Sequence, residues 1–250
     1  MAIEYNKETV LATGELYHIF NRSIAEFKIF NSEADYVRVK NLIKYYQAES
    51  PLLRFSHFLQ SSPIRDQNLM MYPESNYGCK EKIVAIIAYC IMPTHLHLIL
   101  KQLKEKGITN FMNIVSNGYT KYFNTKHKRK GPLWEGRFKR VHVDTDEQLI
   151  HLTRYIHLNP VSAYLVKKPE DWRASSYKEY LGIEGKDNRI CDYEKILEIH
   201  PDQYKKFVED NIDYQRRLAK IKNLILEDDC PPRSGTVIAR CGGRRGYFET

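Results

Sequence analysis

The feature that most constrains the fold is an apolar run, Ile83 to Met92, followed at once by an alternating segment, His95 to Lys101. The apolar run is too short to span a bilayer and is rich in β-branched side chains, so it predicts a buried strand. Pro93-Thr94 interrupts the run, and the alternation after it predicts a second strand. We therefore expect two adjacent antiparallel strands at the centre of the fold.

Strands and helices alternate along the rest of the chain. Helical spacing marks three segments, 33–48, 108–126 and 146–158, and strand character marks two, 16–22 and 133–143. Three residues are suitable caps for the last helix: Asp144, Thr145 and Asp146. Pro160 is expected to disturb the end of that helix. This alternation around an antiparallel core predicts an α+β fold.

Two segments are not predicted to belong to this α+β core. Residues 61–81 hold prolines, serines, asparagine and glycine, which indicates a long loop or an insertion. After Gly185 the sequence becomes a charged helix, predicted over 193–227, and ends in a Gly/Arg-rich tail. We place a boundary near residue 182, between a domain at 1–182 and a helical, basic extension at 183–250.

The positive charge is concentrated in one window. The chain carries a formal net charge of +8, and residues 121–140 hold eight Lys or Arg against one acid, Glu135. Aromatic residues, among them Trp134, stand between these basic residues. Because Lys and Arg neutralise phosphates and aromatic rings stack on unpaired bases, a segment that contains both kinds of side chain suits single-stranded nucleic acid. The alternative is a solvated helix face followed by core aromatics. The predicted DNA-binding residues are Lys121, Lys126, Arg129, Lys130, Trp134, Arg137, Lys139 and Arg140.

The five cysteines are scattered without a CxxC pair, which favours reduced thiols in a cytoplasmic protein over a disulfide framework. The N-terminal residues 1–10 are polar and contain no apolar signal region. We therefore expect a cytoplasmic location and no membrane partner.

Four residues form the candidate reactive group. His95 and His97 stand two apart in a predicted strand, so both rings point to one face and can bind one divalent cation. Tyr155 and Asn159 stand four apart on a predicted helix and share a face, which offers a phenol nucleophile and an amide oxygen. A His-x-His pair alone is weak evidence, and the alternative for Tyr155 is an ordinary aromatic on the buried face of the helix.

Five blocks in order resemble one known family. They are 93–98 (PTHLHL), 119–124 (YTKYFN), 133–139 (LWEGRFK), 154–161 (RYIHLNPV) and 172–177 (WRASSY). Together they resemble the REP-associated tyrosine transposases, relatives of the single-tyrosine HUH transposases, over roughly residues 15 to 180.

The resemblance implies a ferredoxin-like sheet and a specific chemistry. His95, His97 and Asn159 take the places of the ligands of Mg²⁺ or Mn²⁺, and Tyr155 takes the place of the nucleophile. The implied activity is nicking and joining of single-stranded DNA beside hairpins, through a 5′-phosphotyrosine link. The implied assembly is a monomer or a homodimer.

Two other classes of function remain open at the level of sequence. The first is a DNA-binding protein that has lost catalysis and acts by occupancy. The second is a zinc hydrolase or an RNA-processing enzyme, which lacks support because the sequence has no HExxH motif and no carboxylate at ligand spacing beside the histidine pair.

Overall fold

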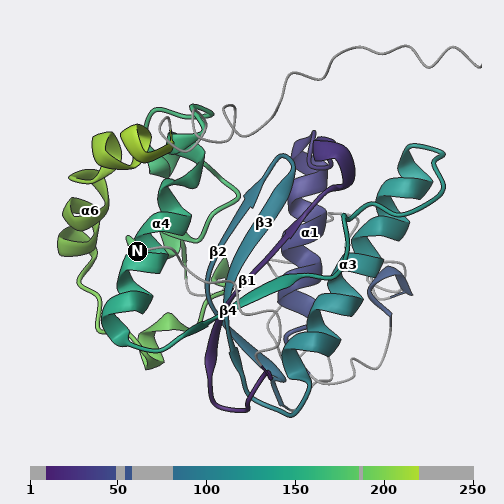
Figure 1. Ribbon diagram of the computed structural model, residues 1–250, viewed down its shortest axis with the longest axis horizontal. Coiled ribbons are helices and arrows are strands. Elements are labelled where there is room, and N and C mark those ends of the chain that lie inside the picture. Colours follow the sequence, from purple (N-terminus) through teal and green to yellow (C-terminus); the bar gives the residue numbers. More distant parts are fainter. Residues whose placement is uncertain (1–9, 49–53, 58–80, 186–187, 220–250) are drawn as a thin grey trace, which may run out of the picture.

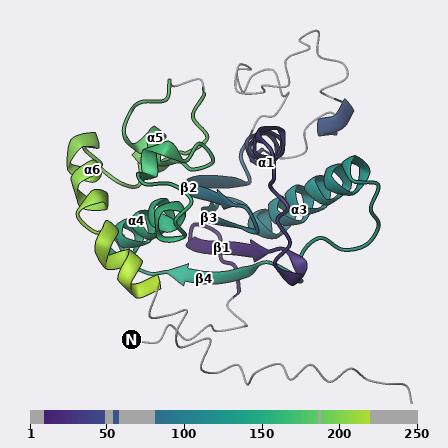
Figure 2. The same ribbon diagram turned by 90° about the horizontal axis from the view of Figure 1, so that it is seen from above.

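The computed structural model describes residues 10–48, 54–57, 81–185 and 188–219 of the chain. These residues form a four-stranded sheet with helices on both faces (Figure 1). The main elements in chain order are β1 (Leu16–Arg22), α1 (Glu33–Tyr45), β2 (Val84–Met92), β3 (His95–Gln102), α3 (Gly107–Lys126), β4 (Lys139–Val143), α4 (Asp146–Ser162), α5 (Tyr177–Tyr180) and α6 (Pro201–Glu209). Seen from above, α1 and α3 cover one face and α4, α5 and α6 lie beyond the other (Figure 2).

The strand order is β2-β3-β1-β4, and every neighbouring pair is antiparallel. α1 lies between β1 and β2 in the chain, and α3 lies between β3 and β4, so each helix belongs to a crossover between strands that are not neighbours. This βαββαβ connection is the ferredoxin-like arrangement. The predicted α+β class and the antiparallel pairing of β2 with β3 are confirmed.

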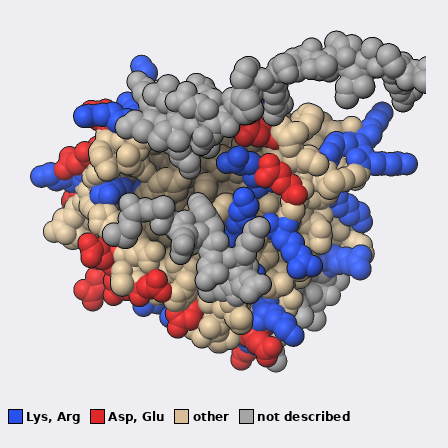
Figure 3. Space-filling model, in the orientation of Figure 1, with Lys and Arg blue, Asp and Glu red and all other residues tan. Residues whose placement is uncertain are grey.

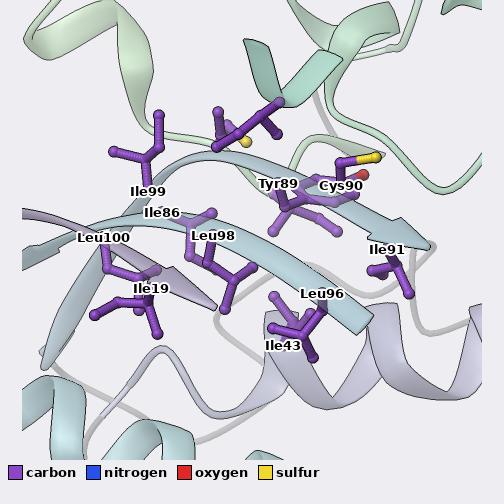
Figure 4. Close-up of a cluster of buried hydrophobic side chains, with 14 of the residues drawn as sticks. Ile19, Ile43, Ile86, Tyr89, Cys90, Ile91, Leu96, Leu98, Ile99 and Leu100 are labelled. Atoms are coloured by element: carbon purple, nitrogen blue, oxygen red, sulfur yellow. The ribbon is translucent and has the colours of Figure 1, made fainter. Parts of the chain in front are cut away.

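The main core lies between the sheet and the pair α1 and α3. Leu96 and Leu98 of β3 are fully buried and lie opposite Ile91 and Tyr89 of β2. In Figure 4, Leu96 points toward Ile43 of α1. All residues of β2 are buried because helices cover both of its faces, which explains an apolar run without alternation.

Three predicted elements differ from the structure. The strand predicted at 133–143 is shorter in the structure, where only β4 forms, because the pairing with β1 stops at Phe20 opposite Lys139. Before that point, Trp134 forms an isolated bridge with Ser23. Pro160 does not end α4, which runs on to Ser162; Pro160 removes one backbone donor, while its own carbonyl still accepts a bond from the amide of Leu165.

The helical character predicted over 193–227 is confirmed for much of its described part, but it occurs as separate helices, over 201–209 and 212–219, and not as one continuous helix. A short turn at Tyr193–Lys195 is followed by a separate helix, α6, that begins at Pro201. Proline fits the first turn of a helix, where its missing N–H is not needed, whereas inside a helix it removes one backbone hydrogen bond, so Pro201 favours the start of a new helix. The remainder of that prediction, 220–227, lies outside the described residues, as do the Gly/Arg-rich tail and nearly all of the loop predicted at 61–81.

The segment after residue 182 packs on the same core as the sheet. Tyr193 stacks on Tyr180 with ring centroids 4.0 Å apart, and Tyr204 of α6 is buried against α4. The boundary near 182 stays a prediction. Among the described residues, Cys90 and Cys191 are buried free thiols, and no helix is long and apolar enough to cross a bilayer.

Candidate active site

His95 and His97 project from β3 on the face opposite the main core. Their ring centroids lie 5.1 Å apart, edge to face, as expected for residues two apart in one strand. His97 is 9% exposed and His95 is half-buried. Both rings therefore line a partly shielded surface on the side of the sheet that faces α4.

Each of the two rings has a partner at Nδ1. His95 Nδ1 lies 2.9 Å from Oγ1 of Thr94, and His97 Nδ1 lies 3.0 Å from Nε2 of His18 in β1. Burial, aided by the charge of Arg22, lowers the pKa of His95 to about 4. The neutral ring that results at neutral pH is the form that binds a metal ion.

Tyr155 lies on α4 beside this pair. Thr145 caps the helix by accepting a bond from the amide of Gln148, which selects one of the three candidate caps. The ring of Tyr155 meets His97 edge to face at 6.2 Å between centroids, and the residue remains 37% exposed. The phenol is thus close to the histidines and still accessible to a large substrate.

Asn159 follows Tyr155 one turn later on α4 and is half-buried. Its side-chain nitrogen Nδ2 is buried and has no hydrogen-bond partner within the described part of the chain. The oxygen and nitrogen of an amide have nearly the same shape, so either atom can occupy this position. An amide oxygen and two neutral imidazoles are compatible with Mg²⁺ or Mn²⁺.

No group of three His, Cys, Asp or Glu side chains within the described ranges could hold a metal by itself. A site made from His95 and His97 therefore depends on a donor of another type, such as the amide of Asn159. The remaining coordination positions would be left to water or to phosphate oxygens.

Part of the predicted DNA-binding set is engaged within the protein. Lys126 lies 2.7 Å from the carboxylate of Asp35, to which the hydroxyl of Tyr122 also donates. Burial alone would raise the pKa of Asp35, but these bonds outweigh it and lower that pKa. Arg129 donates to the backbone oxygen of Pro132. Both cations thus hold the structure around the end of α3.

Trp134 also has contacts within the protein. Its indole nitrogen donates to the backbone oxygen of Ser116 and to the hydroxyl of Thr120, and its ring packs near Phe30 and Tyr119. These contacts favour the interpretation of Trp134 as a partly buried packing residue. A role in stacking on bases stays a prediction.

The other basic residues of the window lie at the surface. Five of them are exposed: Lys121, Lys128, Lys130, Arg137 and Lys139. Arg140 is half-exposed and has a partner in the protein. In Figure 3, basic side chains gather on the side of the molecule where α3 lies in Figure 1, and acidic ones are more frequent at the lower left. The charge asymmetry along the sequence is therefore also an asymmetry in space.

Sequence reasoning missed two histidines. His18 is 79 positions from His97, and only the pairing of β1 with β3 brings the two rings together. His157 lies between Tyr155 and Asn159 in the sequence but is fully buried. The side-chain alternation of the segment 16–22 was the available signal for His18, because it places this ring on the same face as Phe20.

His157 fixes α4 to the rest of the fold. Its Nδ1 is 2.7 Å from the hydroxyl of Tyr204, and its Nε2 is 2.8 Å from the hydroxyl of Ser176. Tyr204 also donates to Thr153 of α4, and Ser176 contacts the backbone of Tyr89 in β2. Burial lowers the pKa of His157 to about 3. This neutral histidine anchors the helix that carries Tyr155.

Known proteins are similar to the part of the chain that carries the candidate site. The family model described as transposase IS200 like matches residues 74–159, which include all four candidate reactive residues. A protein of Haemophilus influenzae (strain ATCC 51907 / DSM 11121 / KW20 / Rd), described as a REP-associated tyrosine transposase, is 27% identical over 110 residues. That match covers 40% of this chain and 62% of the relative's length.

Two solved structures are similar at low sequence identity. A REP-associated tyrosine transposase bound to a REP hairpin has a TM-score of 0.46 and 15% identity, over 74% of this chain and 91% of that chain. A protein of Deinococcus radiodurans, described as a transposase, has a TM-score of 0.33 and 13% identity, over 62% and 95%. The resemblance found in the sequence motifs is confirmed by the family model and the curated relative. Residues 74–159 of the chain are therefore similar to the IS200-like transposase family.

Proposed function

We propose that this protein is a metal-dependent enzyme that cuts and rejoins single-stranded DNA through a tyrosine. The observation that carries the proposal is the position of Tyr155, whose ring lies 6.2 Å from that of His97 in the same chain. A nucleophile on one element beside a histidine pair on another is the arrangement that this chemistry requires. The match of residues 74–159 to the IS200-like transposase model supports the coarser activity of a transposase.

His95, His97 and Asn159 are the residues that would hold a divalent cation. A bound Mg²⁺ or Mn²⁺ supplies positive charge at a non-bridging oxygen of the scissile phosphate. The chain contributes two rings that burial and neighbouring hydroxyl or imidazole groups keep in fixed positions, together with an amide on α4. The accessibility of Tyr155 allows a phosphate to approach between α4 and β3.

The reaction replaces one phosphoester bond with another and therefore needs no added energy source. The phenol oxygen of Tyr155 forms a bond to phosphorus, and the bond from phosphorus to the 3′-oxygen breaks. The phenol proton passes to solvent and the departing 3′-oxygen takes up a proton. The products are a 5′-phosphotyrosine and a free 3′-hydroxyl, and attack by another 3′-hydroxyl reverses the reaction and joins a new strand.

The sheet offers a path for the DNA backbone next to this site. In register, His97 lies opposite Phe20 of β1, and Phe20 lies opposite Lys139 of β4. Residues directly opposite in neighbouring strands point to the same face, so the exposed Lys139 is on the same face as His97. A phosphate bound at Lys139 would then lie about 10 Å from the histidine pair, two strand spacings away.

The proposed partner is single-stranded DNA adjacent to a hairpin. The resemblance of the five sequence blocks to the REP-associated tyrosine transposases supports this class of substrate. The exposed basic residues on and after α3 provide a surface for the negatively charged stem.

The test is covalent capture of DNA. The full chain is incubated with single-stranded hairpin oligonucleotides and Mn²⁺, with and without EDTA, and denatured protein–DNA adducts are separated by electrophoresis. An adduct should form only with the metal and should be lost in Tyr155→Phe, while DNA binding is retained. Tyr164→Phe is the matched control, because Tyr164 is another exposed tyrosine (58%) just beyond the end of α4.

Two outcomes would contradict the proposal. An adduct that persists in Tyr155→Phe would mean that another residue is the nucleophile. Tight binding of hairpins without an adduct, with either metal, would support the alternative function of a DNA-binding protein that acts by occupancy.

A further inference from the structure

His18 lies on the same face of the sheet as His95 and His97, but it is not part of the reactive motifs. It lies in β1, next to β3, and its Nε2 is 3.0 Å from Nδ1 of His97. The two rings are nearly parallel, with an interplanar angle of 21° and centroids 5.2 Å apart. Phe20 packs against both of them, at 5.2 Å and 6.0 Å between centroids. His18 is therefore held in contact with one member of the histidine pair.

A hydrogen bond at Nδ1 decides which atom of an imidazole faces a cation. A neutral imidazole carries one proton, and either ring nitrogen can be the one that coordinates. A partner that accepts a hydrogen bond from one ring N–H leaves the lone pair on the other nitrogen and also fixes the orientation of the ring about its χ2 angle. Such partners are a regular component of histidine metal sites, and their loss weakens metal binding.

We propose that His18 is a positioning residue for His97. Nδ1–H of His97 donates to Nε2 of His18, so that His97 presents Nε2 to the cation. This inference rests on the proposed function, because it assumes that His97 is a metal ligand. It adds a residue from a different strand to the site, outside the residues 74–159 that the family model matches.

The two members of the pair are positioned by different means. His95 has the hydroxyl of Thr94, its neighbour in the chain, at Nδ1. This local contact is built into the sequence motif. His97 depends instead on His18, and thus on the correct register between β1 and β3. The metal affinity should therefore respond to a change in β1 that leaves every predicted ligand in place.

The experiment compares metal binding in the absence of DNA. Mn²⁺ affinity of the full chain is measured from the electron paramagnetic resonance signal of the free ion, for wild type, His18→Phe and His18→Gln. Phenylalanine keeps an aromatic ring beside Phe20 but removes the acceptor, so affinity should fall about 10- to 100-fold. Glutamine restores an acceptor at a similar distance along the side chain and should recover most of the affinity.

Two further measurements isolate the positioning role. His142→Phe changes a histidine of β4 that pairs with Glu15 and lies across from Tyr17, on the other face of the sheet, and it should leave the affinity unchanged. Long-range ¹H–¹⁵N spectra of the metal-free protein report which nitrogen of His97 carries the proton. Wild type should show the proton on Nδ1, and His18→Phe should show a mixture of both forms.

The outcomes separate this inference from the function on which it rests. If His97→Ala leaves Mn²⁺ affinity unchanged, the proposed metal site itself is wrong. If His97→Ala abolishes binding while His18→Phe binds Mn²⁺ as wild type does, the metal site stands and the positioning role is refuted. An unchanged proton position in His18→Phe would refute the positioning role independently of any metal, provided that thermal unfolding shows the variant to be folded.

Discussion

Glu179 offers a quantitative test of how the segment after α5 is held on the core. The residue is 1% exposed, and its carboxylate oxygen Oε2 accepts bonds from the amides of Ile190 at 3.0 Å and Cys191 at 2.9 Å. Glu179→Ala would leave two buried N–H groups without an acceptor. Each such group costs about 1–3 kcal/mol, and removal of a buried charge offsets part of that, so we expect a loss of about 3 kcal/mol.

Glu179→Gln is the matched variant, because its carbonyl oxygen can still accept both bonds. Its free energy of unfolding at pH 7 should lie within about 1 kcal/mol of wild type. Burial raises the pKa of Glu179 above its ordinary value of 4.5, against the effect of the two backbone bonds. The folded protein then binds this proton more tightly than the unfolded chain does, so wild type should gain stability over Glu179→Gln as pH falls from 8 toward 4.5.

Urea unfolding followed by circular dichroism measures all three proteins at several pH values. Equal losses in the alanine and glutamine variants would refute the role of Glu179 as an acceptor for buried amides. A stability difference between wild type and Glu179→Gln that does not change with pH would refute the raised pKa.

Three further changes test other parts of the structure. Gly107→Ala should lower the free energy of unfolding by at least about 2 kcal/mol, because the added Cβ would overlap the backbone carbonyl that precedes β2. Gly118→Ala in the same helix makes ordinary contacts and should be neutral or slightly stabilising; thermal unfolding measures both variants. The free energy of unfolding of wild type should exceed that of Asp35→Asn by its full amount at neutral pH, and this difference should shrink as pH falls below 3.8, because the pKa of Asp35 is lowered in the folded protein. Acid unfolding curves of the two proteins measure this difference. Lys139→Ala should reduce the salt dependence of single-strand binding by about 0.7 in the slope of log K against log salt, while Lys126→Ala should mainly lower stability; binding titrations at several salt concentrations distinguish the two.

The elements of this fold were largely predictable because their signals are local. The apolar run of β2 and the helical spacing of α3 each depend on neighbouring residues, and both matched within one or two positions. One failure occurred where distant residues decide the outcome: the stretch before β4 has strand character but no continuous partner. The other had a local cause, because Pro201 lies within the helix predicted over 193–227 and begins a separate helix.

The candidate site divides in the same way. The spacing of His95 and His97 in a strand and of Tyr155 and Asn159 in a helix is sufficient to predict which side chains share a face. Spacing cannot predict that α4 lies beside β3, since that depends on tertiary packing. It also could not predict His18, whose contact with His97 requires the register of two strands far apart in the sequence.

The buried group of His157, Ser176 and Tyr204 has a consequence for the evolution of the chain. Three separate segments contribute buried polar side chains to this group, and a change at His157 removes one hydrogen bond from each of the two hydroxyls that contact it. Positions 157 and 204 should therefore vary together among relatives that retain the segment up to α6. Sequences with an apolar residue at 157 should favour phenylalanine over tyrosine at 204, so that covariation between these positions records how the tyrosine helix is anchored.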